Sequence, residues 1–317
     1  MNRTQLLVIP NPDPAPLTML HEIEGDVVIV IGDSPEFLAE HAPQADVILN
    51  AAFAGAPFRM AWPLARKVRW IHSLPAGVEN FMTPEFAASA VPLTNGRGVF
   101  KRSLAEFALG AIFHFTKDYR RLMRNQEAGR WEPFDTPFVE GQTLGIVGYG
   151  EIGQEAAKLA RAVGMKVLAL RRRPELSNEK AYAPGQLKEM LARCDYVLAA
   201  TPLTPQTRGM IGENELRAMK PSAVIMNVGR GPVIVEAALI RALREGWIRG
   251  AALDVFDHEP LPEGHPFYGR ANVLLSPHCA DHTPGWIMLA MAKFIENFKR
   301  FQKGEELLNI VDKGAGY

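Results

Sequence analysis

Cysteine is scarce in this sequence, which has two in 317 residues, Cys194 and Cys279. Neither belongs to a Cys-x-x-Cys pair or to a Cys/His spacing typical of a metal site. We therefore expect a reducing compartment, no disulfide framework and no structural metal. Long apolar runs are also missing: residues 6–9 are followed by closely spaced prolines, and no stretch approaches the ~18 apolar residues of a membrane span. These absences predict a soluble, cytoplasmic protein without a signal peptide.

A net charge is missing as well, because 35 Lys and Arg residues balance 35 Asp and Glu residues and the sequence pI is about 7.1. A chain without a basic surplus has no general electrostatic attraction for nucleic acid. What remains is an ordinary globular composition, 47% hydrophobic and 22% charged, over a length that suggests two domains.

The most informative stretch covers residues 143–174. An apolar run leads into Gly148, Gly150 and Gly153, which have the spacing of the dinucleotide fingerprint G-x-G-x-x-G. A helical segment and a second apolar strand follow, and this context favours a nucleotide site over a merely tight turn. We assign the turn to the first glycine, room for a pyrophosphate to the second, and close packing of helix on strand to the third. The positive N-terminus of the helix then faces the phosphates.

Arginine stands at the end of the second strand. Arg171 occupies the position at which an acidic residue would bind the ribose 2′-hydroxyl of NAD, and Arg172 and Arg173 follow it. Guanidinium groups pair with a 2′-phosphate, which a carboxylate would repel. We therefore predict NADP(H), with NAD(H) as the alternative if the arginines form only a solvated turn. Glu151, next to Ile152 in the glycine loop, runs against strong phosphate binding.

The rest of the chain predicts two domains. Residues 1–100 together with 287–317 are expected to form a smaller substrate domain, and residues 101–286 the dinucleotide-binding domain. In the smaller domain, Ser34 and the proline after it have the pattern of a helix start. The strands of that domain are expected at residues 5–9, 26–31, 47–50 and 68–73.

A long amphipathic helix is expected near the start of the second domain. Ser103 and Glu106 have the pattern of a capping box, and apolar residues follow at helical spacing as far as Phe115. Its basic end, from Lys117 to Arg124, suits the C-terminal end of a helix dipole.

From residue 143 onward, strands and helices alternate, which predicts a doubly wound parallel sheet. Ligands bind beyond the C-terminal ends of such strands. The strands are expected at residues 196–200, 223–228, 250–255 and 272–275. Polar residues follow these strands and are expected to meet at one crevice: Thr201, Arg230, Asp254, Glu259 and His278.

Three of these residues make one chemical set beside a nicotinamide. Reduction of a 2-oxo acid needs a guanidinium to hold the carboxylate and polarise the carbonyl, and an acid to protonate the new alkoxide. Arg230 and His278 suit these roles, and Glu259 would fix the tautomer of the histidine and favour its protonated form. Taken singly, each also has an ordinary explanation, as a surface ion pair, a structural histidine or a turn.

With these residues in view, the sequence resembles the D-isomer-specific 2-hydroxyacid dehydrogenases over nearly its whole length. The resemblance implies an α/β fold with two Rossmann-like domains, the larger a doubly wound parallel sheet that binds a dinucleotide and the smaller a flavodoxin-like substrate domain. It also implies a homodimer joined through the nucleotide domains, to which the helix at Ser103 would contribute. It rests on six blocks in the same order: AGV at 76–78, GYGEIG at 148–153, PLTPQTRGMI at 202–211, NVGRGPVI at 227–234, ALDVFDHEPLP at 252–262 and SPHCADHT at 276–283.

The residues that resemble the functional groups of this family fall into three sets. The catalytic triad would be Arg230, Glu259 and His278, of which the first and last would also contact the substrate. The loop that binds the substrate carboxylate would be Ala76, Gly77 and Val78, although an ordinary turn explains it equally well. The cofactor-binding residues would be Gly148, Gly150, Glu151, Ile152, Gly153, Arg171, Arg172, Arg173, Thr201, Pro202, Thr207, Val228, Gly229, Asp254 and His278.

Three places depart from the usual pattern of the family. Arg171 stands where NAD-dependent relatives carry Asp, and is similar to the NADPH-using glyoxylate and hydroxypyruvate reductase branch. Glu151 occupies a position that often holds Arg beside the pyrophosphate. Cys279, Asp281 and His282 replace small or apolar residues after the histidine, so Asp281 adds a charge that bears on substrate specificity and on the pH profile.

From these residues we predict an NADPH-preferring oxidoreductase that reduces a small 2-oxo acid, such as glyoxylate or hydroxypyruvate, to its D-2-hydroxy acid. One alternative is a dehydrogenase for larger branched or aromatic oxo acids, with a pocket lined by Phe53, Phe58, Trp62 and Trp286 unless these are core residues. Another is a non-catalytic, dinucleotide-sensing corepressor-like protein. A formate-dehydrogenase-like chemistry is disfavoured because that branch carries Gln where this chain has Glu259.

Overall fold

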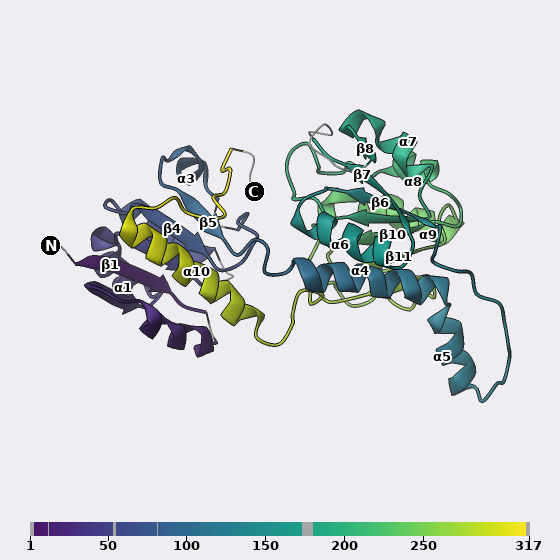
Figure 1. Cartoon of the computed structure of the whole chain (residues 1–317), viewed down its shortest axis with the longest axis horizontal. Helices are drawn as coiled ribbons and strands as arrows, with labels where there is room; N and C mark the ends of the chain where they lie inside the picture. Colours follow the sequence, from purple (N-terminus) through teal and green to yellow (C-terminus); the bar gives the residue numbers. More distant parts are fainter. Residues whose placement is uncertain (1–2, 12, 53–54, 81, 173–179, 315–317) are drawn as a thin grey trace. The chain divides into compact units, whose positions relative to one another are not determined.

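The computed structural model of the chain describes residues 3–11, 13–52, 55–80, 82–172 and 180–314. The chain divides into two compact units: unit 1 comprises Met1–Val99 and Pro284–Tyr317, and unit 2 comprises Phe100–Thr283. Each unit is an α/β fold around one parallel sheet (Figure 1). The predicted fold class, α/β with two Rossmann-like domains, is confirmed.

Unit 1 is built on a five-stranded parallel sheet with the strand order β2-β1-β3-β4-β5. Its strands are short apolar runs, and successive side chains point to opposite faces, so both faces can be buried. Leu7 and Ile48 belong to the core on one face, and Leu6 and Val47 to the core on the other. The strands are β1 (Thr4–Ile9), β2 (Val27–Ile31), β3 (Val47–Asn50), β4 (Trp70–Ser73) and β5 (Leu93–Asn95).

Helices cover both faces of this sheet: α1 (Pro35–His41), α2 (Ala56–Ala61), α3 (Pro84–Ala88) and α10 (Trp286–Lys303), with 3-10 turns at Ala15–Glu22, Ala42–Gln44 and Trp62–Leu64. Phe58 of α2 and Phe86 of α3 pack in the first core, where Trp62 lies edge-on to Phe86 at 4.7 Å between ring centroids. On the second face, Phe294 of α10 stacks on Trp70 at 5.5 Å. The C-terminal helix therefore completes a core that the N-terminal strands begin (Figure 1).

Unit 2 is built on a larger parallel sheet with the order β12-β11-β10-β9-β6-β7-β8. The strand order reverses between β6 and β9, and such a switch point is where ligands bind in open α/β sheets. Because the strands are parallel, their C-terminal ends lie along one edge. The strands are β6 (Thr143–Val147), β7 (Lys166–Leu170), β8 (Lys180–Tyr182), β9 (Tyr196–Ala199), β10 (Val224–Asn227), β11 (Gly250–Leu253) and β12 (Val273–Leu275).

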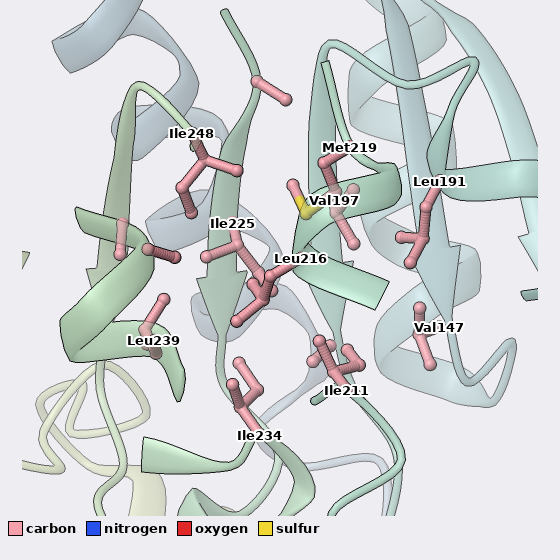
Figure 2. Packing of buried hydrophobic residues seen from close by; sticks show 14 of the residues in the cluster. Val147, Leu191, Val197, Ile211, Leu216, Met219, Ile225, Ile234, Leu239 and Ile248 are labelled. Atoms are coloured by element: carbon pink, nitrogen blue, oxygen red, sulfur yellow. The ribbon is translucent and has the colours of Figure 1, made fainter. Parts of the chain in front are cut away.

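The helices of unit 2 are α4 (Lys101–Thr116), α5 (Tyr119–Glu127), α6 (Glu151–Ala162), α7 (Leu187–Leu191), α8 (Glu213–Ala218) and α9 (Glu236–Glu245), with 3-10 turns at Pro184–Gln186 and Gly231–Val233. Figure 2 shows the core in which Val147, Val197 and Ile225 of the sheet meet Leu216 and Leu239 of α8 and α9. Helix α4 packs against α6 and against β10 and β11. Across the described residues, no helix combines the length and the apolar character needed to cross a bilayer.

The predicted capping box at the start of α4 is wrong. The helix begins earlier, with Phe100 at its N-cap and no side-chain capping bond. The Ser103 hydroxyl donates instead to the carbonyl of Ala280, and Glu106 pairs with Arg102 at 2.6 Å. A partner 177 residues away in the chain therefore overrides the local Ser-x-x-Glu pattern.

The predicted long helix is also interrupted. Asp118 separates α4 from α5: its backbone is left-handed, with φ of 48°, and its side chain caps α5 by accepting the N–H of Arg121 at 3.3 Å. In contrast, the helix start predicted at Ser34 is confirmed, because its hydroxyl accepts the N–H of Phe37 at 3.2 Å.

Candidate active site

The C-terminal edge of the unit 2 sheet collects most of the residues that the sequence singled out. Thr201 lies just beyond β9, Arg230 beyond β10, Asp254 directly after β11 and His278 beyond β12. Because these strands are parallel neighbours, all four residues follow strand ends on the same edge. Glu259 comes from the loop after β11, and the structure brings it into direct contact with His278.

His278 and Glu259 form a hydrogen-bonded pair. Nδ1 of the imidazole lies 2.6 Å from Oε2 of the carboxylate, and the other carboxylate oxygen accepts the backbone N–H of Phe256 at 2.9 Å. The side chains are 43% and 35% exposed. Because an ionised carboxylate can only accept, the bond places a proton on Nδ1 and leaves Nε2 as the nitrogen that exchanges a proton with a substrate.

Asp254 fixes the loop that carries His278. This residue is only 1% exposed, and its Oδ1 accepts from the Ser276 hydroxyl at 2.6 Å and from the N–H groups of Cys279 and Ala280 at 3.0 Å each. Its backbone carbonyl accepts the N–H of His278 at 2.9 Å. His278 has a left-handed backbone with φ of 52°, which a non-glycine residue adopts only when its surroundings enforce it. The bonds to Asp254 supply that enforcement.

Arg230 begins the Gly231–Val233 turn after β10 and is half-buried. Its guanidinium donates to the carbonyl of Gly229 at 2.8 Å, and its own carbonyl accepts from the side-chain amide of Asn227 at 3.0 Å. A Cβ on Gly229 would lie 2.7 Å from the Thr201 carbonyl oxygen, so glycine lets the loops after β9 and β10 pack together. The arginine is thus mounted on a tightly packed strand end.

The three glycines of the loop lie in three different environments. Gly148 has φ of 97°, and a Cβ there would lie 2.7 Å from the carbonyl oxygen of Ala200. A Cβ on Gly153 would lie 2.5 Å from the Gly148 carbonyl oxygen, whereas one on Gly150 would meet nothing within 4 Å. The first glycine makes the turn, the third packs the helix on the strand, and the second faces open space. A pyrophosphate fits such a loop at the N-terminus of α6.

Two side chains of this loop were also predicted at the cofactor. Ile152 is half-buried in α6. One carboxylate oxygen of Glu151 is buried and has no hydrogen-bond partner among the described residues. Glu155, one turn further along, pairs with Arg102 at 3.2 Å. A carboxylate in this loop would oppose the binding of a pyrophosphate, because the two groups carry like charges.

The structure describes two of the three arginines that follow β7. Arg171 is half-buried, and its backbone N–H donates to the carbonyl of Tyr182 in β8 at 3.1 Å. Arg172 is exposed, and Arg173 lies outside the described residues. Arg171 therefore follows directly on the strand whose end would approach the adenosine ribose.

The loop after β9 is stabilised by hydrogen bonds between its own residues. The Thr207 hydroxyl donates to the Pro202 carbonyl at 2.6 Å and accepts the N–H of Thr204 at 2.8 Å. Thr201 is buried, and the N–H of Val228 donates to the Ala199 carbonyl at 3.1 Å. In this structure, the contacts of Thr207 and Val228 hold the strand ends and the loop in shape.

In unit 1, the segment 76–78 follows β4. Val78 is buried, whereas Ala76 and Gly77 are half-buried. The side-chain amide of Asn95 donates to the Ala76 carbonyl at 2.6 Å, and its oxygen accepts the N–H of Arg97 at 3.3 Å. Asn95 thus holds the predicted carboxylate loop against the end of β5.

Sequence reasoning missed a group of strand-end asparagines. Asn227 ends β10 and braces both Gly229 and Arg230, and Asn95 does the same for the loop of unit 1. Asn50 ends β3, where it is fully buried and neither side-chain polar atom has a partner among the described residues. The signal that could have found them is an asparagine as the last residue of an otherwise apolar strand.

Known proteins resemble this chain in sequence and in fold. The model of the D-isomer-specific 2-hydroxyacid dehydrogenase NAD-binding domain matches residues 109–280. Glyoxylate reductase from Korarchaeum cryptofilum is 34% identical over 257 residues, which cover 78% of this chain and 77% of that protein. Glyoxylate reductase from Aeropyrum pernix is 34% identical over 265 residues, covering 78% of each.

Two crystal structures align with the entire chain or nearly so. A D-isomer-specific 2-hydroxyacid dehydrogenase from Xanthobacter autotrophicus, in complex with NADPH and MES, has a TM-score of 0.86 at 28% identity and covers 100% of both chains. An NADPH-dependent glyoxylate/hydroxypyruvate reductase from Sinorhizobium meliloti, in complex with NADP and sulfate, has a TM-score of 0.87 at 25% identity. It covers 99% of this chain and 100% of its own.

Proposed function

The chain belongs to the D-isomer-specific 2-hydroxyacid dehydrogenases, and on this premise we propose that it reduces glyoxylate or hydroxypyruvate to the D-2-hydroxy acid with NADPH. The observation that carries the proposal is the 2.6 Å pair of His278 and Glu259, on the same sheet edge as a glycine loop suited to a dinucleotide. The histidine–glutamate pair supplies a proton, and the glycine loop binds the cofactor that donates the hydride.

The proposed mechanism assigns one task to each residue. Arg230 binds the substrate carboxylate and polarises the carbonyl. Glu259 holds the proton on Nδ1 of His278, so that Nε2 points its own proton at the oxygen on which negative charge develops. Asp254 keeps this imidazole in place through its bonds to the loop. When bound, the nicotinamide supplies the hydride.

The preference for NADPH rests on Arg171 and Arg172 after β7, where no carboxylate stands to bind a 2′-hydroxyl. Arg173 is proposed to join them, on sequence alone. The relatives from Xanthobacter autotrophicus and Sinorhizobium meliloti, whose complexes hold NADPH and NADP, support this proposal. NAD(H) is the alternative. The remaining predicted cofactor residues stay proposals on the same footing.

The carboxylate loop of unit 1 is proposed to bind the substrate through backbone N–H groups at Ala76, Gly77 and Val78. Two observations fit this role. The Asn95 side chain holds the loop by its bond to the Ala76 carbonyl, and two of the three residues are partly exposed. Of the aromatic residues of the alternative interpretation, Phe58 and Trp62 pack in the core of unit 1, whereas Trp286 is half-buried at the start of α10. Phe53 lies outside the described residues.

A homodimer is also proposed, through α4, as the family resemblance implies, and through α5 and the segment after it. Figure 1 shows α5 and this segment standing away from the sheet of unit 2. They expose large apolar side chains: Met123 is 51% exposed, Phe138 81% and Trp131 96%. Apolar side chains so displayed on an ordered segment mark a protein interface. A cytoplasmic location is proposed from the two free cysteines, Cys194 and Cys279.

The test is a set of initial rates with NADPH and NADH against glyoxylate, hydroxypyruvate, pyruvate and phenylpyruvate. We expect NADPH to be preferred over NADH, and glyoxylate and hydroxypyruvate to be the best substrates. Arg171→Asp should reverse the cofactor preference, with NADPH affinity falling roughly tenfold or more as read by NADPH fluorescence. Tight cofactor binding without turnover of any oxo acid would support the corepressor-like alternative instead.

A further inference from the structure

Asp281 is a charged residue of the candidate site to which the proposed mechanism gives no task. It stands three residues after His278, in the loop that Asp254 clamps through the N–H groups of Cys279 and Ala280. Its Oδ1 is buried and accepts no hydrogen bond from any described residue. Its one ion-pair contact in this part of the chain is with Nε2 of His282, at 3.6 Å.

The charged neighbours of Asp281 are His282, His278 and Asp254. Burial raises the pKa of its carboxyl above the usual value, although the charges of His282 and His278 act in the opposite direction. Asp254 adds to the rise, and Glu259 already occupies Nδ1 of His278. The imidazole that delivers the proton therefore has one carboxylate bonded to it and a second carboxylate three residues along the same loop.

The chemistry of the proposed reaction brings the substrate into this field. If His278 protonates the oxygen on C2, then C3 lies only two bonds from an atom in contact with the imidazole. Arg230, the guanidinium of the site, is committed to the carboxylate on C1. A second carboxylate on C3 would bring another negative charge toward Asp281, and repulsion between like charges within several ångströms reduces affinity roughly 10- to 100-fold.

We propose that Asp281 is a specificity-determining residue, which restricts this site to 2-oxo acids that carry a single carboxylate. The inference rests on the proposed function, since it takes the position of the substrate from His278 and Arg230. Its consequence is a substrate class: glyoxylate, hydroxypyruvate and other neutral-substituted 2-oxo acids are accepted, and 2-oxo dicarboxylic acids are rejected.

The test compares oxaloacetate with its C4 amide, which has nearly the same size and shape but lacks the second charge. We expect the wild-type kcat/KM to favour the amide at least ~10-fold, and Asp281→Asn to reduce that ratio roughly tenfold. Taking a ratio within each protein cancels any general loss of activity. Asp281→Glu keeps the charge and should keep the discrimination.

The matched control is Asp257→Asn, which removes another carboxyl of unit 2 whose pKa is raised by burial and whose charged neighbours are Glu236, His258 and Arg208. It should leave the ratio at the wild-type value. In the wild type, raising the salt concentration from about 0.05 M to about 0.5 M should also reduce the ratio, and this measurement needs no variant to fold.

The outcomes separate this inference from the proposed function. A ratio near one in a wild-type enzyme that reduces glyoxylate would overturn the role of Asp281 and leave the reductase intact. Equal loss of discrimination in Asp281→Asn and Asp281→Glu would assign the effect to loop packing, which also overturns it. Failure of the wild type to reduce any of these acids would overturn both.

Discussion

The two units use the same architecture and furnish their strand ends differently. In unit 1, three of the five parallel strands end in buried, neutral polar residues: Asn50, Ser73 and Asn95. In unit 2, charged residues follow the strand ends, and His278 and Glu259 are partly exposed. The fold itself therefore does not set the chemistry. Neutral amides shape a loop, whereas charged groups are suited to binding an anion and moving a proton.

The same difference between the two units is seen in two histidines, one in each unit. His72 of β4 is completely buried, and its Nδ1 lies 2.7 Å from the hydroxyl oxygen of Thr94. Burial, with a smaller effect of Lys293, lowers its pKa to about 3. His278 is partly exposed and has a carboxylate on Nδ1. One imidazole is a neutral part of a core, and the other is partly exposed and bonded to a carboxylate, as the proposed proton transfer requires.

The comparison predicts its largest effect at His278. We expect His278→Ala to lower kcat/KM for the best oxo acid by roughly 10³-fold, because the proton donor is lost, with little change in melting temperature. His72→Gln should do the reverse, lowering the melting temperature while each folded molecule keeps its kcat/KM. Steady-state kinetics and thermal unfolding on both variants measure this. Comparable turnover in His278→Ala and wild type would contradict the proposed mechanism.

Asp254 should give the next largest effect, through position and not through contact. Asp254→Ala leaves the Ser276 hydroxyl and two loop N–H groups without their acceptor, so we expect kcat/KM to fall roughly 10²-fold as the His278 loop loosens. Asp254→Asn keeps an oxygen at Oδ1 and should restore most of the activity and stability. If the asparagine variant is as impaired as alanine, the charge and not the hydrogen bonding matters.

His72 predicts a pH dependence of stability. Its folded-state pKa lies far below the ordinary value of 6.5, so between 6.5 and about 3 the unfolded chain binds a proton that the folded chain does not. Stability is complete above pH 6.5 and is lost as the pH falls, by about 2 kcal/mol between pH 6.5 and pH 5. The free energy of unfolding, measured with denaturant at several pH values in this range, should depend less steeply on pH in His72→Gln than in the wild type. An unchanged slope would place the titrating group elsewhere.

The smallest effect is expected at the neutral strand end. Asn95→Ala removes the bond to the Ala76 carbonyl, so the carboxylate loop should bind more weakly, with KM raised about tenfold and kcat nearly unchanged. A suitable control is Asn297→Ala in α10, which breaks buried bonds to Leu308. It should reduce stability without affecting KM. A rise in KM in both variants would mean that unit 1 merely loosens.

Much of this architecture could be predicted from the sequence because its signals are local. Apolar runs marked most strands, and the glycine spacing marked the turn at Gly148. Polar residues after strands indicated His278 and Glu259, whose contact is observed. The roles of Arg230 and of the cofactor residues stay predictions until they are tested.

What the sequence did not reveal depends on distant partners or on very short elements. The strands β5 and β8 have three residues each, too few for a periodic signal. The capping box failed because Ser103 bonds to Ala280 and Glu106 to Arg102. The clamp that Asp254 applies to the histidine loop also requires a fold, since it joins residues 22 to 26 positions apart.

The hydrogen bond between Ser103 and Ala280 bears on how the two units are joined in one chain. Unit 2 is one uninterrupted stretch, whereas unit 1 is assembled from both ends of the chain. The bond draws the two ends of that stretch together, as tolerated insertions of one domain into a loop of another require. Unit 2 thus has the form of a domain inserted into unit 1. Removal of residues 104–279 would leave two chain ends that a short linker could join.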